Sequence, residues 1–240
     1  MLSSIRKPER LSRIHNCETC AQNVNRLFCG FTAADRKRLD RLGVSMSVLP
    51  GAVLHYEGDR PESVSIVCEG QVKLSCSSRS GKNLILRIAG PGDVLGLSAT
   101  IAGKPQETTA EAIAPTQLKV IPRATLLKFI RECPEAGYRT AAVLAADYEM
   151  ALLDAKRLAL CTSATSRLSR VLLDWARPAA YDKKAEFKMA LSHTELGELA
   201  GLARETVTRT LASLKRRKLI EIAGATIRIP DLAKLESLCD

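Results

Sequence analysis

The sequence predicts an α+β fold with four successive parts: a cysteine-containing N-terminal segment, an antiparallel β-barrel, one long helix, and a C-terminal unit of short helices closed by a β-hairpin. Three observations predict it. Glycines recur between short apolar runs from residue 44 to 121, an uninterrupted helical stretch follows Pro134, and a helix-start motif stands at Ser192. The predicted boundaries are residues 1–30, 31–133, 134–162 and 163–240.

The composition is that of a globular chain. It has 240 residues, of which 46% are hydrophobic and 26% charged, enough for a substantial core. No apolar run approaches the roughly 18 residues of a membrane-spanning helix, and residues 1–16 carry no apolar segment of the kind that a secretory signal needs. We therefore expect a cytoplasmic protein with no membrane partner, whose eight cysteines are thiols or ligands rather than disulfides.

The charge favours a polyanionic partner. The chain has 36 Lys and Arg against 26 Asp and Glu, a net charge of +10. Residues 163–220 hold 12 basic against 6 acidic residues, so the positive field is densest there. Charge alone does not separate nucleic acid from an acidic membrane surface.

Residues 44–121 are typical of short strands in an antiparallel barrel. The runs Val64–Cys68 and Val72–Cys76 are separated by a tight-turn signal at 69–71, and Leu84–Ile88 leads into a Gly-Pro-Gly break at 90–92. Seven glycines spaced through this region mark further turns: Gly51, Gly58, Gly70, Gly81, Gly90, Gly92 and Gly96. This spacing predicts a small β-barrel.

The long helix predicted over 134–162 carries a seam at coiled-coil spacing. Its positions are Ala141, Ala145, Tyr148, Leu152, Ala155, Ala159 and Thr162. A second seam through Leu144, Ala151 and Leu158 fits nearly as well, so the register stays open. The small alanines would let two such helices approach closely, which favours a homodimer. The alternative is a helix buried against its own barrel.

Two short helices are predicted near the C-terminus. Ser192-His-Thr-Glu195 matches the capping box, so a helix should begin at His193. Gly201-Leu202 makes a turn, and Arg204 begins a second helix, which together predict a helix-turn-helix. The apolar residues of the two helices should form a shared core: Leu196, Leu199, Ala200, Val207, Leu211 and Leu214.

The opposite face of the second helix carries candidate base-reading residues: Arg204, Glu205, Thr208 and Arg209. Arg can donate two hydrogen bonds to guanine, and Glu can accept one from cytosine. The basic run Lys215, Arg216, Arg217 and Lys218 is the candidate for phosphate contacts, although some of these residues can be a solvated basic face. Alternating residues at 219–222 and 226–229 predict a hairpin, which completes a winged helix-turn-helix.

With these parts in this order, residues 31–230 resemble the Crp/Fnr family of transcription regulators. The stretch Glu195–Arg209 is very similar to the signature of that family, and the barrel turns at 51, 58, 70 and 90–96 fit its effector domain. The resemblance implies a cyclic-nucleotide-binding-like barrel, a homodimer, RNA polymerase as a partner and TGTGA-like palindromic half-sites in double-stranded DNA. In one departure, Ala203 stands where the family often has a serine that caps the second helix.

The residues by which cAMP-binding members hold their ligand are missing. Their ribose-binding glutamate corresponds to Leu97, and their Arg-Ser phosphate pair to Thr108-Thr109, with Glu107 nearby. Leu152-Leu153 stands where those members have an adenine-binding Thr-Ser pair. Without the arginine a buried phosphate would have no charged partner, so we expect that cAMP is not the effector.

The cysteines suggest another signal. Cys17, Cys20 and Cys29 have the spacing C-x2-C-x8-C, and thiolates so placed can hold zinc or an iron–sulfur cluster. The chain is most similar to the Fnr-like branch with N-terminal cysteines, which implies a 4Fe–4S cluster. The fourth ligand of that branch corresponds to Lys119, which cannot ligate; Cys133, Cys68, Cys76 or a carboxylate could substitute. Unligated thiols or bound zinc stay alternatives, and Cys161 and Cys239 are expected to be structural or incidental.

The function expected from these patterns is a homodimeric, sequence-specific transcription regulator that responds to redox state, oxygen or nitric oxide through an N-terminal iron–sulfur cluster. In the alternative, an unidentified small molecule in the barrel controls the same regulator. A thiol–disulfide enzyme using Cys17 and Cys20 is disfavoured because no βαβ pattern surrounds them. His15, His55 and His193 have no context typical of haem ligands. With no catalytic constellation evident, we expect that the protein is not an enzyme.

Overall fold

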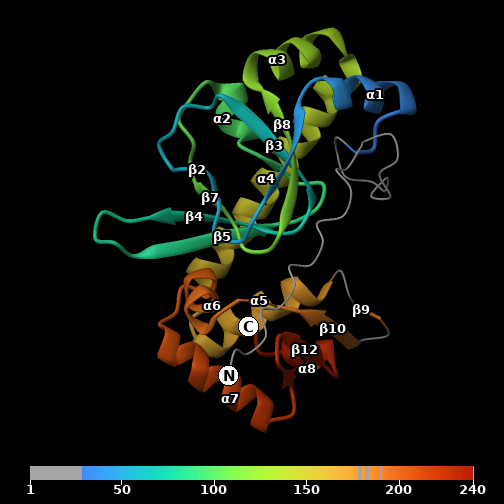
Figure 1. Cartoon of the computed structure of the whole chain (residues 1–240). Helices are drawn as coiled ribbons and strands as arrows, with labels where there is room; N and C mark the ends of the chain where they lie inside the picture. Colours follow the sequence, from blue (N-terminus) through green and yellow to red (C-terminus); the bar gives the residue numbers. More distant parts are fainter. Residues whose placement is uncertain (1–28, 178–179, 182–183, 190, 240) are drawn as a thin grey trace, which may run out of the picture. The chain divides into compact units, whose positions relative to one another are not determined.

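The computed structural model describes residues 29–177, 180–181, 184–189 and 191–239 (Figure 1). These residues form two compact units. One contains the described residues up to 76 together with Arg87–Ala146, and the other contains Ser77–Leu86 together with the described residues from Asp147 onward. Cys17 and Cys20 lie outside the described residues, and the four predicted domain boundaries stay predictions.

The predicted antiparallel barrel is confirmed. Eight short strands form two sheets with the orders β1-β8-β3-β6 and β2-β7-β4-β5 (Figure 1). In the first sheet, β1 pairs with β8 in a register that runs from Val44 opposite Val120 to Val48 opposite Thr116. The strands are β1 Val44–Val48, β2 Val53–His55, β3 Ser63–Glu69, β4 Val72–Ser77, β5 Asn83–Ala89, β6 Val94–Leu95, β7 Thr109–Ala112 and β8 Thr116–Pro122.

A small apolar core joins the two sheets of the barrel. One sheet contributes Val67, Leu95 and Leu118, and the other contributes Val72, Ala89 and Ala110, all of them buried. The turn between β3 and β4 requires glycine because Gly70 has φ +90° and a Cβ there would lie 2.4 Å from the carbonyl oxygen of Pro115. Apolar alternation and glycine turns thus produce the barrel expected from the sequence.

Three short helices accompany the barrel: α1 Ala33–Arg41, α2 Leu97–Ala102 and α3 Arg123–Glu132. Thr32 caps α1 by accepting a hydrogen bond from the backbone N–H of Asp35. A second core cluster contains Phe31 and Phe129, whose rings meet edge to face with centroids 5.8 Å apart. Sequence analysis did not identify α3, whose Leu126 and Phe129 belong to this cluster.

Helix α4 spans Pro134–Leu160 and so ends two residues before Thr162, the predicted end of the helical stretch. It begins at Pro134 as expected, since proline suits the first helical turn. It ends earlier because Ser163 caps the next helix, α5, by accepting from the backbone N–H of Ser166, which leaves 161–163 as the connection. The first turns of α4 bury Ala136, Thr140 and Val143.

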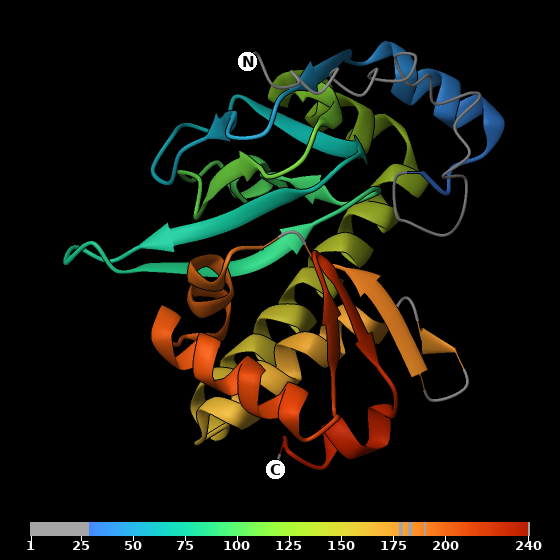
Figure 2. The ribbon, with the colours of Figure 1, turned by 60° about the horizontal axis from the view of Figure 1, so that its bottom comes forward.

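The C-terminal elements surround helix α5 Ala164–Ala176, which contacts α6, α7, α8 and β10. The strands form one sheet in the order β11-β12-β10-β9 (Figure 2). The elements after α5 are β9 Ala180–Tyr181, β10 Lys184–Lys188, α6 His193–Ala200, α7 Arg204–Arg216, β11 Glu221–Ala223, β12 Thr226–Ile229 and α8 Leu232–Glu236. Within the described part of the chain, no helix has the length and apolar character needed to cross a membrane.

Candidate functional sites

The helix-start motif at Ser192 forms the complete capping box that the sequence predicts. The Ser192 hydroxyl accepts from the backbone N–H of Glu195 at 3.2 Å, and the Glu195 carboxylate accepts from the backbone N–H of Ser192 at 2.9 Å. Two otherwise unpaired donors of the helix terminus are therefore satisfied. As a result, α6 begins at His193.

Two glycines make the turn between α6 and α7 possible. Gly201 ends α6 in the left-handed region at φ +67°. Gly197 lets the chain after the turn approach the helix, because a Cβ at Gly197 would lie 2.5 Å from the carbonyl oxygen of Leu202. The predicted shared core is confirmed, since its members are all buried: Leu196, Leu199, Ala200, Val207, Leu211 and Leu214.

The start of α7 presents the predicted base-reading residues to solvent. Arg204, Glu205, Thr208 and Arg209 are all exposed, whereas Val207 and Thr210 on the opposite face are buried. The charged side chains of Arg204, Glu205 and Arg209 make no ion pair within the described residues. Their charges are therefore available to a partner, on a helix whose apolar face is fixed by packing.

Helix α7 begins without a side-chain cap, as expected for Ala203. At its other end, Lys215, Arg216, Arg217 and Lys218 are exposed and form no ion pair in the part of the chain that the structure describes. Lys218 adopts φ +59°, the left-handed conformation that often ends a helix. This turn leads into the β11–β12 hairpin, which confirms the predicted wing; its first strand starts at Glu221 rather than at Leu219.

One contact at this surface was missed by sequence analysis. His193 Nδ1 lies 2.8 Å from Thr208 Oγ1, and Thr208 Oγ1 also donates to the backbone carbonyl of Arg204 at 3.1 Å. The contact joins the first residue of α6 to the second turn of α7. Its two residues lie 15 positions apart, so no local motif could indicate it.

The barrel positions that correspond to a nucleotide site have a different chemistry. Leu97 is buried at the start of α2, where the resemblance would require the ribose carboxylate. Glu107 accepts a hydrogen bond from Ser98 Oγ at 3.0 Å, and Thr109 Oγ1 accepts from the backbone N–H of Glu57 at 3.0 Å. The side chain of Gln106, itself buried, packs against Gly96.

The described cysteines are spread over both units. Cys29 is half-buried, and Cys133 is buried in the cluster of Phe31 and Phe129. Burial raises the pKa of the Cys76 thiol, and the charge of Glu57 raises it further. Burial likewise raises the pKa of the Cys239 thiol, which favours the unreactive protonated form. Among the residues that can be described, no three His, Cys, Asp or Glu side chains gather as metal ligands would.

Lys119 occupies the place of the expected fourth cluster ligand. Its side chain is only 5% exposed, and its Nζ lies 3.0 Å from Asp40 Oδ1 on α1. A buried ammonium group in an ion pair has no lone pair to offer a metal. The ion pair instead links helix α1 to strand β8.

The candidate dimer positions on α4 are exposed. Tyr148 has 72% of its surface exposed and Leu152 44%, and the other members of the first seam are exposed as well: Ala141, Ala145, Ala155 and Ala159. Leu144 of the second seam instead packs against the core cluster of the barrel. Ala151 of the second seam is exposed like the first seam, so the register of a dimer contact along α4 stays open.

Comparison with known proteins identifies both parts of this arrangement. A family model for a Crp-like helix-turn-helix domain matches residues 166–238, and one for a cyclic nucleotide-binding domain matches residues 45–133. The second match names a domain type and not a ligand of this chain.

Individual relatives cover most of the chain. The cyclic AMP receptor protein of Thermus thermophilus is 28% identical over 193 residues, which are 78% of this chain and 84% of that protein. The nitrogen fixation regulation protein FixK of Bradyrhizobium diazoefficiens is 27% identical over 226 residues, 93% of this chain and 94% of that protein. The solved structure of FixK2 from Bradyrhizobium japonicum matches with a TM-score of 0.74 at 24% identity, covering 82% of this chain and 98% of that one, which shows a shared fold.

Proposed function

The chain belongs to the Crp/Fnr family of transcription regulators, and from this premise we propose that it binds palindromic DNA as a homodimer and reads the sequence with the start of α7. The observation that carries the proposal is the exposed set of Arg204, Glu205 and Arg209, charged and unpaired within the described residues. A helix-turn-helix presents this end of its second helix to the major groove.

The residue types suggest the bases that are read. Arg204 and Arg209 can each donate two hydrogen bonds to guanine O6 and N7, and Glu205 can accept one from cytosine N4. In the family, this pattern accompanies TGTGA-like half-sites, so we propose such half-sites here, centred about one helical turn apart. Lys215, Arg216, Arg217 and Lys218, all exposed, would contact phosphates.

The exposed row of α4 supports the homodimer. Its alanines allow close approach of two helices, and Tyr148 and Leu152 would bury large apolar surface in a second copy. The two α7 helices of such a dimer would read two half-sites. RNA polymerase is the further partner that family resemblance suggests.

Half-site spacing tests the palindrome and the dimer together. Binding of the full chain to a duplex with two TGTGA half-sites is compared with binding to the same duplex carrying about five extra base pairs between them, which turns one half-site by about half a helical turn. We expect the insertion to reduce the affinity to that of a single half-site. Equal affinity for both duplexes would contradict recognition by a dimer.

For the signal, we propose redox state, oxygen or nitric oxide, acting through Cys17, Cys20 and Cys29. An iron–sulfur cluster, expected to be of the 4Fe–4S type, would make these thiols responsive to an oxidant. The described residues supply one of the three, Cys29, and Lys119 does not fit as a fourth ligand because it is buried and paired with Asp40. The fourth ligand would have to come from elsewhere.

Anaerobic purification tests this signal. We expect the broad visible absorbance of a cluster, a higher dimer fraction and tighter DNA binding, all three lost in air and in a Cys20→Ala variant. The alternative effector is an unidentified small molecule in the barrel. We propose that it is not cAMP, because Leu97 and Thr108 stand where cAMP-binding members have a glutamate and an arginine that contact the ligand. A colourless, zinc-free protein that binds DNA equally well with all three cysteines changed to alanine would favour this barrel ligand.

A further inference from the structure

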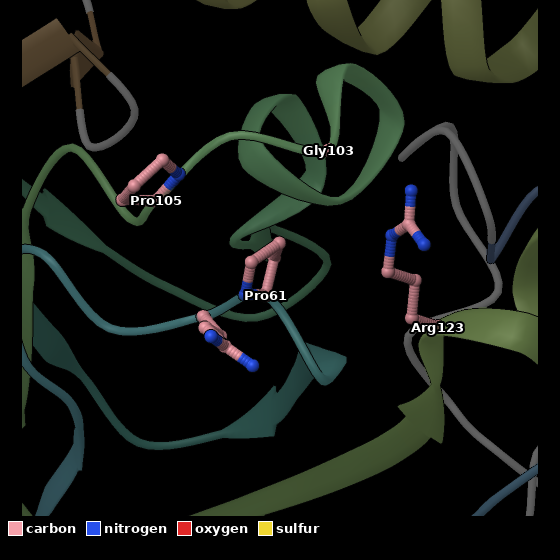
Figure 3. Close-up of a pocket in the computed structure, with 5 residues that line it drawn as sticks. Pro61, Gly103, Pro105 and Arg123 are labelled. Carbon is pink, nitrogen blue, oxygen red and sulfur yellow. The ribbon is translucent and has the colours of Figure 1, made fainter.

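A pocket of about 390 Å³ lies in the barrel unit (Figure 3). Its lining residues lie far from helix α7 in the sequence. Three segments line it: Arg60 and Pro61 after β2, Gly103 and Pro105 after α2, and Arg123 at the start of α3. None of these five residues is acidic, and two are arginines. Leu97, Thr108 and Thr109, the positions that correspond to a nucleotide site, are not among them.

Arg123 is held in place by its neighbours. Its Nε donates to the carbonyl oxygen of Thr100 at 3.0 Å, and its backbone N–H donates to the carbonyl oxygen of Glu62 at 2.8 Å. Figure 3 shows the side chain extending toward the turn at Gly103. A Cβ at Gly103 would lie 3.2 Å from Arg123 Nη2, so glycine leaves room for the guanidinium group. The terminal nitrogens of that group make no ion pair within the described residues.

Arg60 supplies a second cation. Its backbone carbonyl accepts from the N–H of Glu62 at 2.9 Å, which fixes the local turn, while its exposed guanidinium group makes no hydrogen bond or ion pair with any described residue. The adjacent carboxylate, Asp59, instead accepts from the backbone N–H of Tyr56 at 2.7 Å. Two arginines without a carboxylate partner among the described residues therefore line the same pocket.

We propose that this pocket binds a small molecule through its phosphate group. Each guanidinium group offers paired N–H donors that match the oxygens of a phosphate. None of the five lining residues is a carboxylate that would repel the phosphate charge. The volume lies at the lower end of small-ligand pockets. Pro61 and Pro105 add rigid apolar surface for an organic moiety.

Titration calorimetry at constant ionic strength tests the site, with inorganic phosphate, glucose 6-phosphate and glucose as probes on the full chain. We expect saturable binding of both phosphates and none of glucose. Tighter binding of glucose 6-phosphate would identify an organic phosphate as the ligand, and equal binding would identify phosphate itself. Arg60→Ala should weaken binding about tenfold or more, because it removes charge-assisted hydrogen bonds from an exposed residue that the fold does not need.

Arg131→Ala is the matched control. It removes an exposed arginine from α3, the helix that begins at Arg123, and Arg131 does not line the pocket. It should leave phosphate binding unchanged. Arg123→Gln, where it folds, should weaken binding as Arg60→Ala does. The proposal is overturned if the unmodified chain binds neither phosphate, or if Arg131→Ala weakens binding as much as Arg60→Ala. A loss of DNA affinity in Arg60→Ala without phosphate binding would also overturn it and assign the arginine to DNA.

Discussion

His193 at the start of α6 and Thr208 in α7 are joined by a hydrogen bond of 2.8 Å between Nδ1 and Oγ1. A threonine hydroxyl has a single hydrogen, and here it is directed to the carbonyl oxygen of Arg204. With the hydroxyl hydrogen so directed, the contact requires the His193 tautomer that carries its hydrogen on Nδ1. The contact fixes one of the proposed base-reading residues from the neighbouring helix.

We predict that His193→Ala weakens specific DNA binding by about 1 kcal/mol, the value of one such hydrogen bond. Thr208→Val should cost at least as much. If the two residues act through their contact, the double variant should cost no more than Thr208→Val, as measured by fluorescence anisotropy in a double-mutant cycle. Fully additive losses would show that His193 acts on DNA by itself.

The two helix starts give opposite predictions for stability. Ser192→Ala should lower the free energy of unfolding by about 1 kcal/mol because it breaks the capping box. Ala203→Ser should raise it by a similar amount, since it supplies the missing cap of α7. Urea unfolding measures both. If Ala203→Ser left stability unchanged, the start of α7 would already be satisfied by another partner.

The Lys119–Asp40 ion pair should be sensitive to loss of one partner. Asp40→Ala should lower the free energy of unfolding by about 3 kcal/mol, because it leaves a buried ammonium group without its counter-charge. Lys119→Met combined with Asp40→Ala should recover most of that loss. Lys128→Ala at the exposed Lys128–Glu132 pair of α3 is the control, and should cost well under 1 kcal/mol. Equal losses for Asp40→Ala and Lys128→Ala would contradict the buried pair.

Phosphate contacts should differ from base contacts in their salt dependence. Lys215→Ala should weaken binding to all DNA sequences alike and reduce the slope of log affinity against log salt by about 1. Affinities at several salt concentrations, on the palindrome and on an unrelated duplex, measure both effects. An unchanged slope would place Lys215 away from the phosphates.

The sequence predicted the elements whose signals are local. Apolar alternation and the turn at Gly70 indicate β3 and β4, and the capping box at Ser192 indicates the start of α6. The shared core of α6 and α7 follows from helical spacing alone, so its members could be named beforehand.

Features that depend on distant residues could not be predicted. Lys119 and Asp40 are 79 positions apart, and the pocket arginines Arg60 and Arg123 lie on separate elements. Helix α5 was missed although Leu168, Val171 and Leu172 have helical spacing, because buried Ser166 and Ser169 weaken the apolar pattern. Ser166 is satisfied by the carbonyl oxygen of Cys239, 73 positions away.

The register of the long helix shows the same limit. Both apolar rows of α4 fit a seam in the sequence, and in the structure Leu144 of the second row packs against the barrel core while Ala151 of the same row is exposed. The row with Tyr148 and Leu152 is left exposed. The sequence could not show where packing against the barrel ends along α4, because alanine and leucine suit either environment.

The most direct test of sequence-specific recognition by α7 is the affinity of Arg204→Val for a set of duplexes, each with one base pair of the TGTGA half-site changed. We predict a loss of about 1–3 kcal/mol on the unaltered site. On the duplex that lacks the G·C pair read by Arg204, we predict no further loss, so selectivity disappears at that position alone. Equal weakening on every duplex, with selectivity kept at each position, would contradict base reading by Arg204.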